Sequence, residues 1–256
     1  MLGRIAAFLY GLACYLTSFL AFVYAVGFVG NIVVSKSSDS SRLTSLGHAL
    51  AVDAALLGLI AIQQSFMSRP WFKAAWLRIV PKPIERSTYV LLSSATLLLL
   101  FWKWEPLGGV VWEMKNQDVR LILGMTFVFG WMTVLITTFL VNHFDLFGVR
   151  QVWANLLGRD FEPTTFPTPG LRRYVRHHLY LGFLLAFWSA PVMTITHLVL
   201  AVATTGYVLL KLQTEERDVV RPYFEPRRRV SMELTRSFLR EVDGVAIGQS
   251  AVTRAG

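Results

Sequence analysis

Residues 5–34 read IAAFLYGLACYLTSFLAFVYAVGFVGNIVV, a run without a single charged side chain. A helix needs about 20 predominantly apolar residues to cross the hydrocarbon core of a bilayer, so this run is long enough to span it. It also exceeds the apolar segment of about 7–15 residues in a secretory signal peptide, and no small-residue cleavage site stands out. We therefore interpret the run as a retained first membrane span.

The composition of the whole chain agrees with membrane insertion. Of its 256 residues, 54% are hydrophobic and 16% are charged, with a mean hydropathy of +0.49. Soluble domains carry roughly 25% charged residues, so this chain has too little polar surface for a soluble globule. The net charge of +9 reflects loop Lys and Arg in so apolar a chain, and no nucleic-acid-binding motif is recognisable. The single cysteine, Cys14, excludes an internal disulfide and a cysteine-based metal site.

Further apolar runs predict an all-α, polytopic membrane helix bundle. We expect about five full spans, at residues 5–34, 45–66, 87–102, 119–141 and 192–212. The apolar stretch 180–190 is too short to cross alone, since 11 residues make a helix of about 16 Å, and Pro191 disfavours helix at the residue before it. We therefore expect a C-terminal helical hairpin, in which a short arm 178–190 folds against the long arm 192–212.

The basic residues predict the orientation of these spans. With the N-terminus in the cytoplasm, 20 of the 25 Lys and Arg residues fall on the cytoplasmic side of the membrane. This asymmetry follows the positive-inside rule and predicts an inner-membrane protein with both termini in the cytoplasm. We expect a single membrane domain over residues 1–240 and a weakly ordered tail over residues 241–256.

This topology brings unusual polar residues to the cytoplasmic ends of the helices. They are Gln63, Gln64, Glu85, Arg86, Asn142, His143, Asp145, Arg176, His177 and Glu215 to Asp218. Helix ends are normally polar and capped, so each residue alone is readily explained as a structural end residue. Their convergence from five helix ends favours a functional site. Asp53 lies within the second span, where a carboxylate is costly; it forms an interhelical hydrogen bond or has a functional role.

The sharpest local signal is the stretch RHHLYLG at residues 176–182, with Glu215 and Glu216 about 35 residues later. A hairpin places its beginning and end side by side, so these two clusters are expected to meet. Arginine binds a carboxylate bidentately, and the free N–H groups that start a helix favour an anion. An aromatic face such as that of Tyr180 stabilises a sulfonium cation, and a glutamate accepts an ammonium group or a ribose diol. These groups suit a zwitterionic, ribose-bearing sulfonium ligand, although basic–acidic pairs are also common at membrane interfaces.

These motifs resemble the isoprenylcysteine carboxyl methyltransferase superfamily, whose cofactor-binding half is similar to residues 176–182, the apolar hairpin and Glu215-Glu216. Further segments look like the bacterial methanethiol S-methyltransferase branch of that superfamily. They are FLYG (8–11), YAVGFVGN (24–31), ERSTYVL (85–91), NHFDLFG (142–148), PGL (169–171) and EERD (215–218). The resemblance covers roughly residues 5–220.

The resemblance implies an enzyme that transfers a methyl group from S-adenosylmethionine to methanethiol, a small volatile thiol, and forms dimethyl sulfide in bacterial sulfur metabolism. It implies cofactor-binding roles for Arg176, His177, Tyr180, Gly182, Glu215 and Glu216. We place substrate contacts at Gln64, Glu85, Arg86 and Tyr89. Methyl transfer from a sulfonium needs no metal, because the leaving group is already activated, and we expect none.

A small alkyl thiol has a pKa at or above about 8.5, so a nearby base would help to form the thiolate. His143 is our candidate base, oriented by Asp145; the alternative is a helix-capping role for His143. The chain departs from the family pattern at three places: His178 replaces a proline, Gln64 replaces a histidine, and the stretch after Asp218 is shortened. These departures leave three alternatives open: a catalytically impaired scaffold or sensor, a methyltransferase for another small thiol or an isoprenylcysteine-like substrate, and a small-solute transporter.

Overall fold

The computed structural model describes residues 1–213, apart from residues 35, 40–43, 68 and 162–168. The predicted all-α fold with about five spans is confirmed, because five helices within these residues are long and apolar enough to cross a membrane. They are Leu2–Gly30, Leu46–Met67, Lys82–Lys103, Gln117–Leu140 and Ile195–Gln213. The chain divides into two units, Met1–Gly206 and Tyr207–Gly256. The domain boundary expected at residue 240 lies outside the described residues and stays a prediction.

Helix α1 (Leu2–Gly30) ends four residues before the end of the apolar run that predicted it. Asn31 adopts a left-handed backbone conformation with a φ of 54° and closes the helix, a common way for a helix to end. The chain then folds back, since the backbone N–H of Ser38 donates to the carbonyl oxygen of Phe28 at 3.1 Å. The predicted continuation to residue 34 is therefore wrong, because hydropathy alone does not register the cap.

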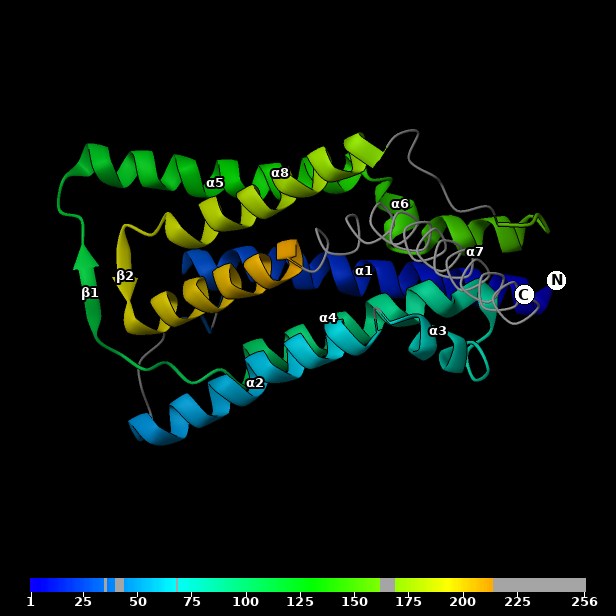
Figure 1. Cartoon of the computed structure of the whole chain (residues 1–256), viewed down its shortest axis with the longest axis horizontal. Helices are drawn as coiled ribbons and strands as arrows, with labels where there is room; N and C mark the ends of the chain where they lie inside the picture. The colour runs from blue at the N-terminus through cyan, green and yellow to red at the C-terminus, as the bar shows by residue number, and fades with distance from the viewer. Residues whose placement is uncertain (35, 40–43, 68, 162–168, 214–256) are drawn as a thin grey trace, which may run out of the picture. The chain divides into compact units, whose positions relative to one another are not determined.

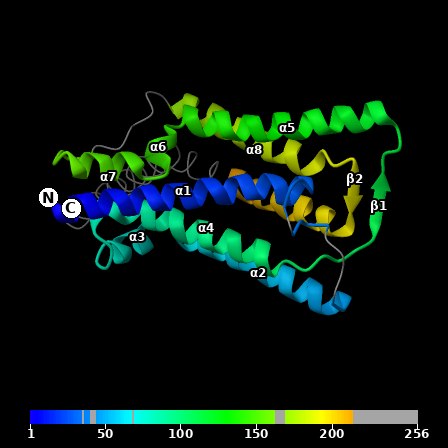
Figure 2. The same ribbon diagram turned by 180° about the vertical axis from the view of Figure 1, so that it is seen from behind.

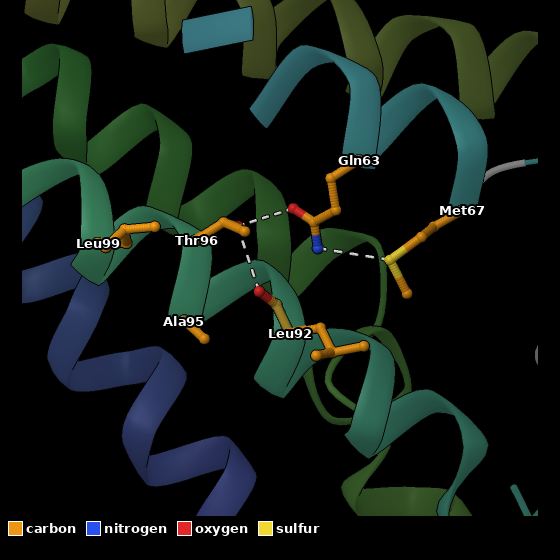
Figure 3. A pocket seen from close by; sticks show the side chains of 6 residues that line it. All are labelled: Gln63, Met67, Leu92, Ala95, Thr96 and Leu99. Carbon is orange, nitrogen blue, oxygen red and sulfur yellow. Dashed lines mark hydrogen bonds between the residues drawn. The ribbon is translucent and has the colours of Figure 1, made fainter. Parts of the chain in front are cut away.

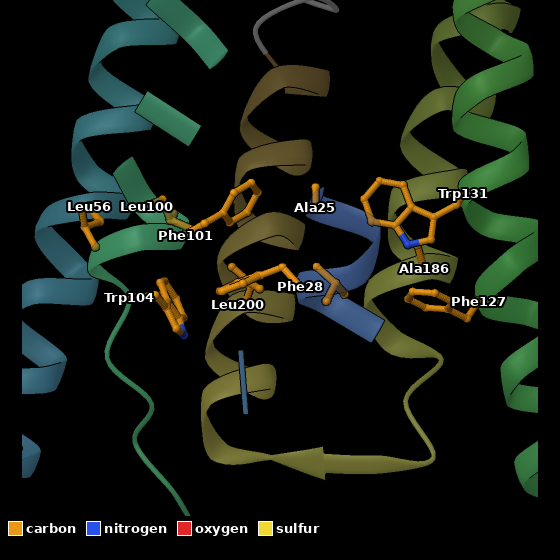
Figure 4. Packing of buried hydrophobic residues seen from close by; sticks show 11 residues of the cluster. Ala25, Phe28, Leu56, Leu100, Phe101, Trp104, Phe127, Trp131, Ala186 and Leu200 are labelled. Atoms are coloured by element: carbon orange, nitrogen blue, oxygen red, sulfur yellow. The ribbon is translucent and has the colours of Figure 1, made fainter. Parts of the chain in front are cut away.

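Helix α4 (Glu85–Lys103) packs against both α1 and α2 (Leu46–Met67), as Figure 1 shows. The core at this junction is aromatic (Figure 4): the ring of Phe28 lies 4.8 Å from that of Phe101 and 6.1 Å from that of Trp104, between centroids. In lipid, such packing rather than the exclusion of water holds helices together. The shorter elements of the same end as Met1 are α3 (Pro70–Trp76), η1 (Lys82–Ile84), α6 (His143–Leu146) and α7 (Val149–Leu156).

Helix α5 (Gln117–Leu140) lies along α8 (Pro169–Trp188), and their backbones meet at two glycines. A Cβ atom added to Gly130 would lie 2.6 Å from the backbone nitrogen of Ala186 and 2.8 Å from the carbonyl oxygen of Gly182. A Cβ atom on Gly182 would lie 2.9 Å from the carbonyl oxygen of Gly130. Small residues permit this close approach in membrane helices, and here no larger side chain fits at the crossing.

The C-terminal hairpin is present, but its first arm differs from the prediction. Helix α8 has 20 residues instead of the expected short arm 178–190, because the helix continues upstream through the polar stretch that precedes the apolar one. Between the arms lies a strand that the sequence did not predict, β2 (Val192–Thr194), which pairs antiparallel with β1 (Val110–Glu113). Figure 2 shows both strands at the end of the first unit opposite Met1, which we call the far end.

Polar contacts fasten the far end. Asp39, in the segment after α1, accepts hydrogen bonds from Asn31 and from Thr194, and one of its carboxylate oxygens lies 4.0 Å from Nδ1 of His197. Asp53 is buried in α2, where its Oδ1 accepts the backbone N–H of Glu105 at 2.9 Å. The interhelical hydrogen bond that is one of the two explanations for Asp53 is therefore present.

The α5–α8 crossing yields a stability prediction. Gly130→Ala should destabilise the protein by about 1–3 kcal/mol, because the added methyl group meets backbone atoms that cannot move aside independently. Gly124→Ala on the same helix is the matched control, since a Cβ atom there meets nothing within 4 Å. Unfolding of the purified protein in mixed detergent micelles, followed by circular dichroism, compares the two. Equal stability of the two variants would contradict the backbone contact.

Candidate functional site at the end that holds Met1

Several elements meet at the end of the first unit that holds Met1 (Figures 1 and 2). The end of α5, the short helices α6 and α7 and the start of α4 lie beside the first half of α1. Close packing fixes this junction: Gly148, with a φ of +81°, places its backbone 2.8 Å, measured from an added Cβ atom, from the nitrogen of Ser87. A Cβ atom on Gly11 of α1 would lie 2.6 Å from Val152 of α7. The candidate residues of these elements are therefore held rigidly.

The side chain of His143, the candidate base, is buried in an aromatic cluster. Its ring stacks on that of Phe139 with centroids 4.3 Å apart and planes 8° from parallel. Phe147 lies 4.7 Å away, while Phe144 and Tyr15 present edges at 5.6 Å. Only 3% of His143 is exposed. Burial lowers the pKa of the imidazole below its ordinary value, so the ring is neutral at pH 7.

Both ring nitrogens of His143 have partners, and Asp145 is neither of them. The Nε2 atom lies 3.1 Å from the hydroxyl of Tyr15, and the Nδ1 atom lies 2.9 Å from the hydroxyl of Thr138. Asp145 instead lies 3.9 Å from a guanidinium nitrogen of Arg150. The predicted orientation of His143 by Asp145 is therefore wrong, because two hydroxyl groups on other helices position the ring.

Tyr15 and Thr138 are the residues that sequence analysis missed. Tyr15 is a half-buried residue of α1, and Thr138 lies five residues before His143 in the last turn of α5. The contact between Tyr15 and His143 joins positions 128 residues apart, which no local pattern reveals. The one signal available was a phenol and a hydroxyl inside otherwise apolar runs.

Gln64 and Tyr89, two expected substrate contacts, hydrogen-bond each other. The hydroxyl of Tyr89 donates to the carbonyl oxygen of Gln64 at 2.9 Å, and the amide of Gln64 donates to Ser93 at 3.2 Å. Next to them, Thr96 donates to Gln63 at 2.7 Å, as Figure 3 shows. This network joins α2 to α4 and uses both ends of the Gln64 amide.

A hollow of about 240 Å³ opens beside this network (Figure 3). Its walls are largely apolar, with polar groups only from α2 and α4, and it is lined by Gln63, Met67, Leu92, Ala95, Thr96 and Leu99. A hollow of this kind suits a small apolar molecule better than a charged one.

Glu85 and Arg86, the other two expected substrate contacts, tie the start of α4 to its neighbours. A carboxylate oxygen of Glu85 lies 3.6 Å from the ammonium group of Lys73 in α3. The Nε of Arg86 donates to the carbonyl oxygen of Leu146 in α6 at 3.1 Å. The structure thus brings Arg86 to the helix that begins with His143.

The residues expected to bind the cofactor lie along α8. Arg176 and Tyr180 are half-buried and His177 is exposed, whereas Gly182 faces Gly130 at the α5 crossing and has a packing role. Because α8 begins at Pro169, the backbone N–H groups near residue 178 lie inside a helix. The free helix start expected there is therefore absent. Glu215 and Glu216 lie outside the described residues.

The crossing brings Arg176 to the level of the aromatic cluster. Arg176 precedes Gly182 by six residues and Thr138 follows Gly130 by eight, which correspond to about 9 Å and 12 Å of helix. The two helices are antiparallel, since Gly182 lies against both Gly130 and Val134 while Gly130 also meets Ala186. Both displacements therefore run toward the end that holds Met1.

Comparisons with known proteins agree with this assembly. No family model matches the chain, and no solved structure matches it. Curated relatives match over nearly its full length. A methanethiol S-methyltransferase of Crocosphaera subtropica is 49% identical over 235 residues, covering 90% of this chain and 92% of the relative. Methanethiol S-methyltransferase 1 of Bradyrhizobium diazoefficiens is 46% identical over 233 residues, covering 90% and 82%. The methanethiol S-methyltransferase of Mycobacterium tuberculosis is 46% identical over 235 residues, covering 90% and 96%. The chain therefore belongs to the methanethiol S-methyltransferase family.

Proposed function

We propose that this chain is a membrane enzyme that methylates methanethiol with S-adenosylmethionine and releases dimethyl sulfide and S-adenosylhomocysteine. The observation that carries the proposal is the identity of 46–49% to relatives named methanethiol S-methyltransferase, over 90% of the chain. The geometry supports it, because a neutral buried imidazole and a basic, aromatic helix segment lie at one end of the first unit.

The cofactor assignment rests on the chemistry of α8. The guanidinium of Arg176 suits the carboxylate of a methionine moiety, which it binds through two parallel hydrogen bonds. The ring of Tyr180 suits a sulfonium, and His177 lies where a polar part of the ligand meets water. Glu215 and Glu216 remain the proposed partners of the ammonium group and the ribose. When bound, S-adenosylmethionine would supply a methyl group that is already activated for displacement.

The protein must position the thiol, exclude water and help to remove the thiol proton. Holding two reactants in line accounts for a large share of the rate of such a displacement. The thiolate is the nucleophile, and the neutral state of His143 at pH 7 makes the ring a proton acceptor. The aromatic side chains around it keep water away from this end of the site.

We propose a multi-pass location in the bacterial inner membrane with both termini in the cytoplasm. Five apolar helices support membrane insertion, and 20 of the 25 Lys and Arg residues then lie on the cytoplasmic side. In this orientation the candidate site opens toward the cytoplasm, where S-adenosylmethionine is made.

The activity itself is the first test. Membranes that contain the chain should form dimethyl sulfide from methanethiol and S-adenosylmethionine, measured by gas chromatography of the headspace. Membranes from the same host without the chain are the control. Release of no thioether from methanethiol or from larger thiols, by protein that still binds the methyl donor, would sink the proposal in favour of a sensor.

The second test concerns the methyl donor. Arg176→Ala should weaken binding of S-adenosylmethionine by roughly 10- to 150-fold, which corresponds to the loss of about 1.5–3 kcal/mol from a charge-assisted hydrogen bond. Arg120→Ala removes an exposed arginine at the start of α5 and should leave binding unchanged. Calorimetric titration of detergent-purified protein gives both values. A parental affinity in the Arg176 variant would place the donor elsewhere.

The third test concerns orientation. A fluorescent protein fused to the C-terminus should be bright, and alkaline phosphatase fused at the same position should be inactive, because the first matures in the cytoplasm and the second in the periplasm. The reverse pattern would invert the topology and move the site to the other side of the membrane.

A further inference from the structure

The hydrogen bonds around His143 fix which of its nitrogens carries the proton. The hydroxyl of Thr138 donates to the carbonyl oxygen of Leu135 at 2.7 Å, and a carbonyl can only accept. A hydroxyl group has a single proton, so the oxygen of Thr138 must accept from Nδ1 of His143 at 2.9 Å. A neutral imidazole carries one N–H group, so its Nε2 is an acceptor.

The direction of the remaining hydrogen bond then follows. The hydroxyl of Tyr15 lies 3.1 Å from Nε2 of His143 and must donate its proton to that nitrogen. The chain of donors therefore runs from Tyr15 through His143 and Thr138 to the backbone of Leu135. The phenol oxygen of Tyr15 keeps its lone pairs, while its proton already points at a basic nitrogen.

Exposure separates the roles of the two rings. His143 is buried to 3% exposure, and both of its nitrogens are occupied. Tyr15 is only half-buried, so of the two groups its oxygen is the one that a bound molecule can reach. The neighbouring charged groups are held elsewhere: Asp145 lies beside Arg150, and the Nε of Arg86 donates to Leu146.

We infer that Tyr15 is the residue that takes the thiol proton, and that His143 acts through it as a positioning residue and proton store. This inference rests on the proposed function. The S–H bond of the thiol breaks and its proton goes to the oxygen of Tyr15, while the proton of Tyr15 goes to Nε2 of His143. The sulfur electron pair forms the new bond to the methyl carbon, and the electrons of the old carbon–sulfur bond stay on the sulfonium sulfur. The phenol is regenerated, and the imidazolium lies against the face of Phe139.

After the product leaves, the imidazolium returns its proton through Tyr15 to water, which restores the starting tautomer. A buried imidazolium is costly, and burial already lowers the pKa of His143. The return of the proton is therefore favourable, and the ring is ready for the next thiol. No oxidant, metal or further reactant enters these steps.

The test uses two thiols of similar size and different acidity, ethanethiol and the more acidic 2,2,2-trifluoroethanethiol. Tyr15→Phe keeps the ring of Tyr15 and removes its oxygen. It should lower kcat with ethanethiol by roughly 100-fold, the lower end of the range for general base catalysis, and lower it far less with the acidic thiol. A purely structural role would lower both rates equally.

The matched control is Tyr24→Phe, which removes a phenol of the same helix whose hydroxyl donates to the carbonyl oxygen of Lys36 at the far end. It should behave like the parent with both thiols. Binding of S-adenosylmethionine, measured by calorimetry, should be unchanged in both tyrosine variants, which confirms that each is folded.

A second readout does not depend on turnover. Nitrogen-15 NMR of histidine-labelled protein should show His143, identified by the signals lost in His143→Gln, with Nδ1 protonated and Nε2 unprotonated. Tyr15→Phe should shift the Nε2 signal, because it removes the donor. The opposite tautomer would overturn the inference whatever the activity.

The outcomes separate the two levels of the argument. A parent protein that methylates no thiol overturns the proposed function, and the proton transfer falls with it. An active parent whose Tyr15→Phe variant loses the same factor with both thiols, or loses nothing, overturns the role of Tyr15 alone.

Discussion

The backbones of α5 and α8 touch where Gly130 meets Gly182, and much of the candidate site depends on this contact. Two helices approach so closely only where neither carries a side chain at the crossing. The contact fixes how far each helix is advanced along the other. It therefore sets Arg176 on one helix at the level of Thr138 on the next, and with Thr138 the ring of His143. A crossing built on longer side chains would leave room for sliding and would loosen this alignment.

Polar groups inside an apolar bundle are costly unless they find partners, and this bundle satisfies them in separate groups. Gln64 and Tyr89 pair between α2 and α4, Asp53 accepts the N–H of Glu105, and Asp39 binds the loop and strand of the far end. Each group joins elements that the chain visits at different times. The polar residues thus specify which helices lie side by side, while the aromatic core supplies contact area.

Local sequence was sufficient for the spans and insufficient for the partners. The five membrane helices follow from runs of apolar residues, because the length of such a run decides whether it can cross a bilayer. The same reasoning missed the true start of α8, since the segment before residue 178 is polar and its helical state depends on neighbours outside the apolar run. It also missed β1 and β2, which are short and pair across a large separation.

The site shows the same division. His143 and Arg176 stand out in the sequence because charged or titratable residues are rare beside apolar spans. Their partners do not: Asp145 was chosen for His143 because it is two residues away, whereas the ring is held by Tyr15 on the first helix. Hydroxyl groups inside apolar runs are common, and only the fold selects the ones that matter.

The pairing of β1 with β2 has a consequence for biogenesis. Val110 pairs with the region of Thr194, so at a synthesis rate of about 5–20 residues per second β1 leaves the ribosome roughly 4–16 seconds before its partner exists. During this interval the first four spans are already made, and the edge of β1 lies unpaired outside the apolar segments. The strand pair can close only after the last hairpin has been inserted. Closure of this small sheet therefore marks the completion of assembly, and until then the translocation machinery or a chaperone must tolerate an open strand.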